Sequence, residues 1–233
     1  MAGQHYYLLS ALPALGELGS APPLMRQDFA EAVAEAGGPV AVIRAILLSD
    51  DLMQRQAVLA GELDAGDLDL AFLTPGEAQG EAPLPAELAA EEDGERPDTP
   101  RATQDAVWAA YFAHADEVAR RTGSAFLRAW VGHEVALRNA LAAERAKTLG
   151  LDPNDYVIAP ALTDAEAELG DAVADWSAAE TPLAGLRTLD QARWEWLRQR
   201  EAWFSFGDGE LAVYAARLVL LHRWRRLETE RKE

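Results

Sequence analysis

The residues best placed for chemistry lie in one short stretch, where His133, Glu134 and Arg138 fall within two helical turns. Helical spacing puts Glu134 beside Trp130 and Leu137, and a carboxylate on an apolar face must either find a partner or stay protonated. Arg138, at i+4, is its nearest predicted partner. A structural ion pair and a contact to a protein partner both explain this pair. A small enzyme site built from Glu134, Arg138 and His133 is a less favoured alternative.

Other catalytic and metal-binding patterns are missing from the sequence. The four histidines, His5, His114, His133 and His222, have neither a second histidine nor a glutamate at the Glu-x-x-His spacing of metal sites in helical bundles. The chain has no cysteine, no phosphate-binding glycine loop and no nucleophile elbow. We therefore predict a non-enzymatic protein with no catalytic, cofactor-binding or metal-binding residue.

The candidate interaction residues are aromatic or lie next to Glu134. Trp194 and Trp196 point about 200° apart on one predicted helix, so they cannot both face the same core. Core packing is expected to account for most of these tryptophans, and the less favoured alternative is that one of them anchors a protein interface. The full set of candidates is Glu134, Arg138, Asn139, Trp194, Trp196 and Trp203.

The charge of the chain points to the kind of partner. The net charge is −18, and a surface this acidic repels nucleic acid phosphates and anionic lipid. We expect a basic protein surface as the partner, with no nucleic acid and no direct membrane insertion. No stretch approaches the roughly 18 apolar residues of a membrane span, and the first residues carry no basic segment typical of a signal peptide. The expected location is the cytoplasm.

Apolar periodicity predicts helices throughout the chain. Ser124 is a predicted N-cap for the longest helix, which ends near residue 149 and is expected to be central because both of its sides can pack. Prolines, glycines and the acidic run at residues 91–98 predict a linker. The predicted fold is an all-α bundle of two lobes, residues 1–76 and 102–233, joined by an acidic linker at 77–101. The predicted helices are residues 25–36, 40–48, 51–63, 103–121, 124–149, 164–176, 189–204 and one beginning at 208.

Three separated segments of the chain match strings of a known family. The first is the opening string YYLLSALP at residues 6–13, with Pro22 to Leu24 and Asp28-Phe29 after it. The second is Glu134-Val-Ala-Leu-Arg-Asn139, and the third is the end of the chain, residues 206–225. Together they resemble a family encoded within bacterial V-type ATP synthase operons, and the second is also similar to the E-x-x-L-R-N segment of the all-helical central-stalk subunits of V-type ATP synthases. A first-lobe D-x-x-N-L segment is only partly matched, because Gln54 stands where Asn is expected, and this leaves an internal repeat in doubt.

The resemblance implies a non-catalytic subunit or assembly factor of a V-type ATP synthase, in the place of the central-stalk subunit that joins the shaft to the membrane rotor. Other ATP synthase subunits are then the expected partners, and the location is peripheral to the membrane through that assembly. Two alternatives stay open: a free-standing acidic adaptor that binds a basic protein, and the small enzyme described above.

Overall fold

The chain of 233 residues is described by a computed structural model over residues 5–89, 100–201 and 205–229. These ranges contain nine α-helices, short 3₁₀ turns and no strand, which confirms the all-α prediction. The helices are α1 (Tyr6–Ala11), α2 (Arg26–Glu35), α3 (Val40–Ala60), α4 (Pro75–Gln79), α5 (Pro100–Thr122), α6 (Ala125–Leu149), α7 (Gly170–Ser177), α8 (Pro182–Arg198) and α9 (Asp208–Thr229).

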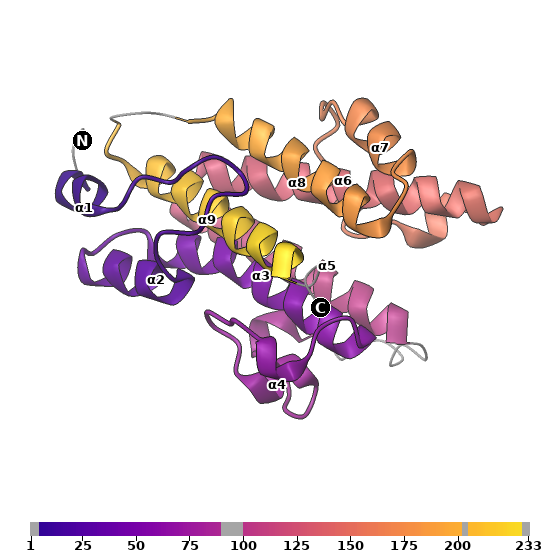
Figure 1. Ribbon diagram of the computed structural model, residues 1–233, viewed down its shortest axis with the longest axis horizontal. Helices are drawn as coiled ribbons and strands as arrows, with labels where there is room; N and C mark the ends of the chain where they lie inside the picture. The colour runs from indigo at the N-terminus through magenta and orange to yellow at the C-terminus, as the bar shows by residue number, and fades with distance from the viewer. Residues whose placement is uncertain (1–4, 90–99, 202–204, 230–233) are drawn as a thin grey trace.

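Four long helices form the centre of the molecule. Helix α3 packs against α5 and α9, and α6 packs against the same two helices, so the four enclose a common core (Figure 1). Helix α8 lies along α9, α7 covers α8 and α6, and α2 packs on α3 and α9. The prediction of a central long helix agrees with α6, whose N-cap Ser124 accepts a hydrogen bond from the Leu127 amide at 3.2 Å.

The two predicted lobes share one core. A single cluster of buried apolar side chains includes Ile46 of α3, Tyr111 of α5, Leu127 of α6 and Leu221 of α9. Of the predicted linker, residues 90–99 lie outside the described ranges. The described residues 77–89 pack on α3 and α5 and bury Leu88, and residues 100–101 already belong to α5, so the second long helix begins inside the predicted linker. The last helix thus lies beside the first long one, and the core is continuous across the predicted boundary.

Helix α3 differs from the prediction of two separate helices. Ser49, Asp50 and Asp51 interrupt an apolar run, and such short polar side chains often favour caps and turns over helix interiors. Here the Ser49 hydroxyl donates to the Ile46 carbonyl at 2.7 Å, while both aspartates are buried and paired. The helix therefore continues from Val40 to Ala60, because tertiary partners satisfy the groups that were expected to end it.

Candidate functional site

Glu134 pairs with a different arginine from the one predicted. Its two carboxylate oxygens accept from Arg193 of α8, at 2.8 Å from Nε and 3.0 Å from Nη2. Burial by itself raises the pKa of the Glu134 carboxyl, but the charge and hydrogen bonds of Arg193 bring it below its usual value. The predicted pair with Arg138 is wrong, because α8 offers a planar guanidinium fork that matches both oxygens.

Arg138 and Asn139 also make internal contacts. The Arg138 guanidinium lies 4.7 Å from the centre of the Trp108 ring and 3.6 Å from the Asp105 carboxylate, both on α5. Asn139 is 9% exposed, and its side-chain amide binds both backbone groups of Ile158. The three polar residues of the E-x-x-L-R-N string thus hold α6 to α8, to α5 and to the loop after it.

A second buried carboxylate extends the Glu134 pair toward α9. Arg193 Nη1 lies 3.3 Å from Asp190 Oδ1, and Arg223 Nε lies 3.3 Å from Asp190 Oδ2. Asp190 is fully buried, and its burial raises the pKa of its carboxyl despite the nearby positive charges of Arg223 and Arg193. Glu134, Asp190, Arg193 and Arg223 therefore form one charge network that joins α6, α8 and α9.

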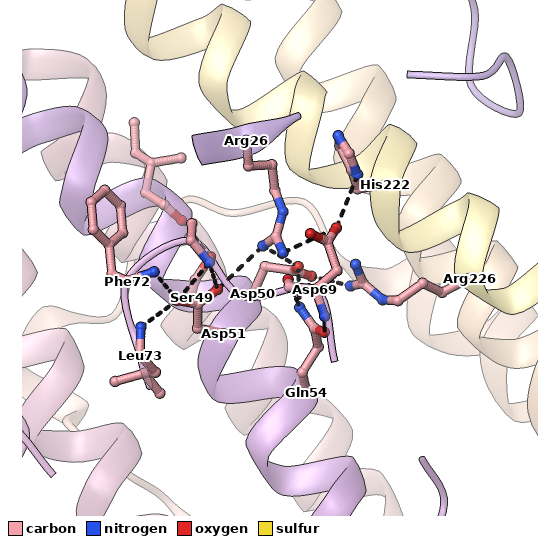
Figure 2. Close-up of polar contacts among 12 residues, drawn as sticks. Arg26, Ser49, Asp50, Asp51, Gln54, Asp69, Phe72, Leu73, His222 and Arg226 are labelled. Atoms are coloured by element: carbon pink, nitrogen blue, oxygen red, sulfur yellow. Dashed lines mark hydrogen bonds and ion pairs between the residues drawn. The ribbon is translucent and has the colours of Figure 1, made fainter. Parts of the chain in front are cut away.

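A second cluster of charges joins the start of the chain to its end (Figure 2). Arg26 of α2 is buried among Asp50, Asp51 and Asp69, and it forms ion pairs with all three. Arg226 of α9 pairs with Asp50 from the other side. Burial alone raises the pKa of the Asp50 carboxyl, but the charges of Arg226 and Arg26 lower it below its usual value.

Two of the acidic residues in this cluster have distinct roles. Asp51 accepts hydrogen bonds from the backbone amides of residues 71–73, at 2.7 to 3.2 Å, and so fixes the chain that leads into α4. Asp69 faces His222, with Oδ2 3.3 Å from Nδ1. The hydrogen bond from His222 and the charge of Arg26 lower the pKa of Asp69 to about 2. The opposite ring nitrogen of His222 lies 2.9 Å from the Leu24 carbonyl.

Gln54 keeps the geometry of an amide clamp even though asparagine was expected at its position. Gln54 Oε1 accepts from the Asp69 amide at 2.8 Å, and its Nε2 donates to the Asp69 carbonyl at 2.7 Å. Asn139 does the same for Ile158, at 3.0 and 2.9 Å. In both halves of the bundle, an amide side chain on a central helix therefore clamps the backbone of the segment that follows that helix.

The charge networks meet at a small cavity inside the bundle. Its volume is about 40 Å³, and its polar lining comes from Ser49, Asp50, Glu134, Arg193 and Arg223. A water molecule occupies roughly 30 Å³ of liquid and needs two to four polar partners. The cavity is thus large enough for water and leaves little room for an organic substrate, whose pockets typically measure about 300 to 1,000 Å³.

The candidate tryptophans differ in burial and in the residues they contact. Trp194 is 3% exposed, and the Arg217 guanidinium lies 4.2 Å from its ring centre. Trp196 is half-buried, and its ring stacks on His133 with centroids 4.8 Å apart. The tryptophans thus point to different neighbours, as their spacing predicts, but Trp194 presents no surface to a partner. Trp203 lies outside the described residues.

His133 is buried, and its ring nitrogens make no hydrogen bond within the described ranges. It is 5% exposed, and both nitrogens lie away from solvent. Burial lowers the pKa of His133; the charge of Glu134 opposes this effect, while Arg193 and Arg200 add to it. The ring is therefore neutral at pH 7 and packs as an aromatic group against Trp196.

The residues that carry the buried networks are not apparent from the sequence alone. Asp50 and Asp51 interrupt the apolar stretch AILLSDDL, and Arg223 and Arg226 lie in what the sequence presents as a basic, solvated end. A charge inside an apolar helical run is a signal of a buried pair. The partners remain hidden, because Asp50 and Arg226 are 176 positions apart.

Two properties of the described residues bear on the kind of site. In the described ranges, no group of three or more His, Asp or Glu side chains is arranged to hold a metal ion. Among the described helices, none combines the length and apolarity that crossing a bilayer requires.

Comparison with known proteins gives a family. The model of the family described as "Protein of unknown function (DUF2764)" matches residues 84–233, which is more than half of the chain. This all-helical chain therefore belongs to that family. Neither the curated proteins nor the solved structures contained a match.

Proposed function

We propose that this chain is a non-catalytic subunit or assembly factor of a V-type ATP synthase, in the place of its central-stalk subunit. It works in the cytoplasm, peripheral to the membrane through that assembly, and its partners are other ATP synthase subunits. The proposal starts from the resemblance of three separated segments, at residues 6–13, 134–139 and 206–225.

One observation carries the proposal furthest: two of these segments, from opposite ends of the chain, contact each other. The Tyr214 hydroxyl donates to the Pro13 carbonyl at 2.8 Å. The His5 amide, directly before the first segment, donates to the Phe206 carbonyl at 3.0 Å. His5 Nε2 also lies 2.6 Å from the Asp208 carboxylate. Two segments that resembled the family by chance would not be expected to contact each other. Two segments that specify one architecture would be expected to do so.

The second of the three segments, residues 134–139, supports a scaffolding role. Its three polar side chains join α6 to neighbouring elements, through Arg193, Asp105 and the Ile158 backbone. The enzyme alternative requires Glu134, Arg138 and His133 to converge on one substrate, but Glu134 and Arg138 pair with residues on different helices. The adaptor alternative shares the acidic surface and differs only in the identity of the partner.

Affinity purification of the tagged chain from its own host tests the proposal. At low salt we expect V-type ATP synthase subunits to co-purify, and we expect a slower rate of complex formation as ionic strength rises, because long-range steering by the acidic surface is screened. The control is an unrelated acidic protein that carries the same tag. If the eluate contains no ATP synthase subunit at low salt, the proposal is wrong and the free-standing adaptor becomes the better account.

A further inference from the structure

The segment between α6 and α8 has an unusual charge. Residues 151–186 contain eight Asp and Glu residues and no Lys or Arg. Most of these carboxylates are exposed, including Glu166, Glu168, Asp171 and Asp175. The segment forms one edge of the molecule in Figure 1, where α7 lies over α6 and α8. This edge thus combines strong negative charge with access to solvent.

An open groove lies at the same edge, between α6 and α7. Its volume is about 390 Å³, and it is lined by Glu144, Gly170, Val173, Ala174, Ser177 and Ala178. The lining side chains from α7 are all small, so the groove lets another backbone approach closely. On the helical wheel of α7, Asp171 and Asp175 lie beside the groove-lining face. Glu144 therefore lines a groove with a partly apolar floor, and the two α7 carboxylates lie beside it.

Apolar surface on α7, at the end of α6 and in the loop between them is incompletely covered. Helix α7 is amphipathic, yet none of its residues is fully buried. Leu149 at the end of α6 is 71% exposed, and Leu151 and Val157 in the following loop are also exposed. Exposed large apolar side chains rimmed by charged ones are typical of protein interaction sites.

Few positive charges oppose the carboxylates here. Arg145 of α6 stacks on the Trp176 ring with its guanidinium 5.0 Å from the ring centre, and Lys147 lies 3.6 Å from the Glu144 carboxylate. Arg200 contributes an electrostatic interaction with Asp164. These three cations are fewer than the eight carboxylates of residues 151–186, so the surface around the groove keeps a negative field.

We propose that the groove between α6 and α7 binds an amphipathic helix of a partner protein, with apolar residues on one face and lysines or arginines along its edges. The apolar face would contact Val173 and Ala174, while the basic edges would face Asp171, Asp175 and their neighbours. A second copy of this chain is a poor occupant, because it carries the same net charge of −18. The inference rests on the proposed function only in requiring a protein partner.

Peptide binding followed by nuclear magnetic resonance tests this inference on the full chain. The probe is a synthetic peptide of about 18 residues, or five helical turns, made of leucine and lysine with the leucines on one helical face. Two further peptides serve as controls: one with the same composition in scrambled order, and one with glutamate in place of lysine. We expect the first peptide to shift amide resonances in the second half of α6, the loop after it and α7. The other two peptides should cause no such shifts.

Matched variants separate the groove from general charge attraction. The groove variant is Glu168→Gln with Asp171→Asn and Asp175→Asn. The control is Asp28→Asn with Glu31→Gln and Glu35→Gln on α2, which removes the same charge from a distant exposed helix. We expect at least about tenfold weaker binding for the groove variant and less than twofold for the control. Equal losses in both, or shifts spread over the whole acidic surface, would overturn the proposal.

A substitution that fills the groove tests its apolar part. Ala174→Trp places a large ring in the groove at an exposed position, and Ala34→Trp does the same on exposed α2 as a control. Only the first should block the peptide, and equal binding by both variants would overturn the proposal. The peptide assay contains no ATP synthase subunit, so its failure leaves the proposed function standing. Peptide binding without co-purification would retain the groove and reject that function.

Discussion

Gln54 and Asn139 hold the backbone in the same way from equivalent places on two central helices. Each side-chain amide donates to the carbonyl and accepts from the amide of a single residue, Asp69 for Gln54 and Ile158 for Asn139. Glutamine is longer than asparagine by one methylene, yet it makes the same pair of backbone contacts. The sequence departure at Gln54 thus leaves the structural role intact.

Removal of either clamp should destabilise the fold. We expect Asn139→Ala and Gln54→Ala each to lower the free energy of unfolding by about 1 to 3 kcal/mol, because backbone groups that are buried at Ile158 and partly buried at Asp69 lose their partners. Chemical denaturation measures both values. The control is Gln27→Ala, an exposed amide that pairs only with Glu31, for which a change under about 0.5 kcal/mol is expected. Equal, small effects at all three positions would show that the clamps carry no stability.

The partner of Glu134 can be settled by double-mutant cycles. Glu134→Ala leaves the guanidinium of Arg193 buried with one partner fewer, so a loss of about 3 to 5 kcal/mol in unfolding free energy is expected. The coupling energy between Glu134→Ala and Arg193→Ala should be large, and the coupling between Glu134→Ala and Arg138→Ala should be much smaller, because those two charges interact without an ion pair. Strong coupling to Arg138 instead would reinstate the pair predicted from the sequence.

His133 should make stability depend on pH. Its pKa is lowered in the folded chain, so between the unfolded value of about 6.5 and the lower folded value the unfolded chain binds more protons. The free energy of unfolding therefore has its full value, as far as His133 is concerned, above about pH 6.5, and it decreases as the pH drops below 6.5. His133→Phe keeps an aromatic ring against Trp196 and should flatten this dependence. Thermal unfolding between pH 5 and 8 measures it.

A second substitution at the same position separates titration from packing. His133→Gln also removes the titrating ring, so it should flatten the pH dependence equally, but it should lower stability at every pH because the stack on Trp196 is lost. His114, whose pKa burial also lowers, accounts for part of the remaining slope. An unchanged slope in both His133 variants would contradict the assignment.

Asp69 should contribute stability that is lost in acid. Its pKa is about 2 in the folded chain, below the ordinary value near 3.9, so its contribution is present above that ordinary value and disappears as the pH falls toward 2. Asp69→Asn should remove this acid-sensitive part while leaving the backbone clamp by Gln54 in place. Unfolding curves between pH 2 and 5 that match those of the unaltered chain would count against the Asp69–His222 contact.

Part of the fold follows from local patterns in the sequence. The periodicity of α6, its N-cap Ser124 and the all-α class were all predicted correctly, because each depends on residues within a few turns of one another. The continuity of α3 was not predicted, since Asp50 and Asp51 look like a helix end until their distant partners are known. Arg226 and Asp50, like Arg193 and Glu134, meet only in the folded chain.

In the candidate site, too, the sequence predicted the local geometry but not the contacts between distant residues. The sequence correctly indicated that Trp194 and Trp196 face different neighbours, because helical geometry fixes that angle. It could not show that Trp194 is covered by α9 or that Arg193 displaces Arg138 as the partner of Glu134. Those outcomes depend on how α8 and α9 pack against the rest of the bundle, which local spacing does not encode.

The central claim, that this chain belongs to a V-type ATP synthase, is tested most directly by the reciprocal purification. The synthase is isolated from the host through a tag on one of its catalytic subunits, and this chain is quantified in the product by mass spectrometry. Our account predicts that the chain is present, in a fixed ratio to the synthase if it is a subunit and in a smaller amount if it assists assembly. Its absence from intact synthase and from partly assembled complexes, both purified at low salt, would contradict the account.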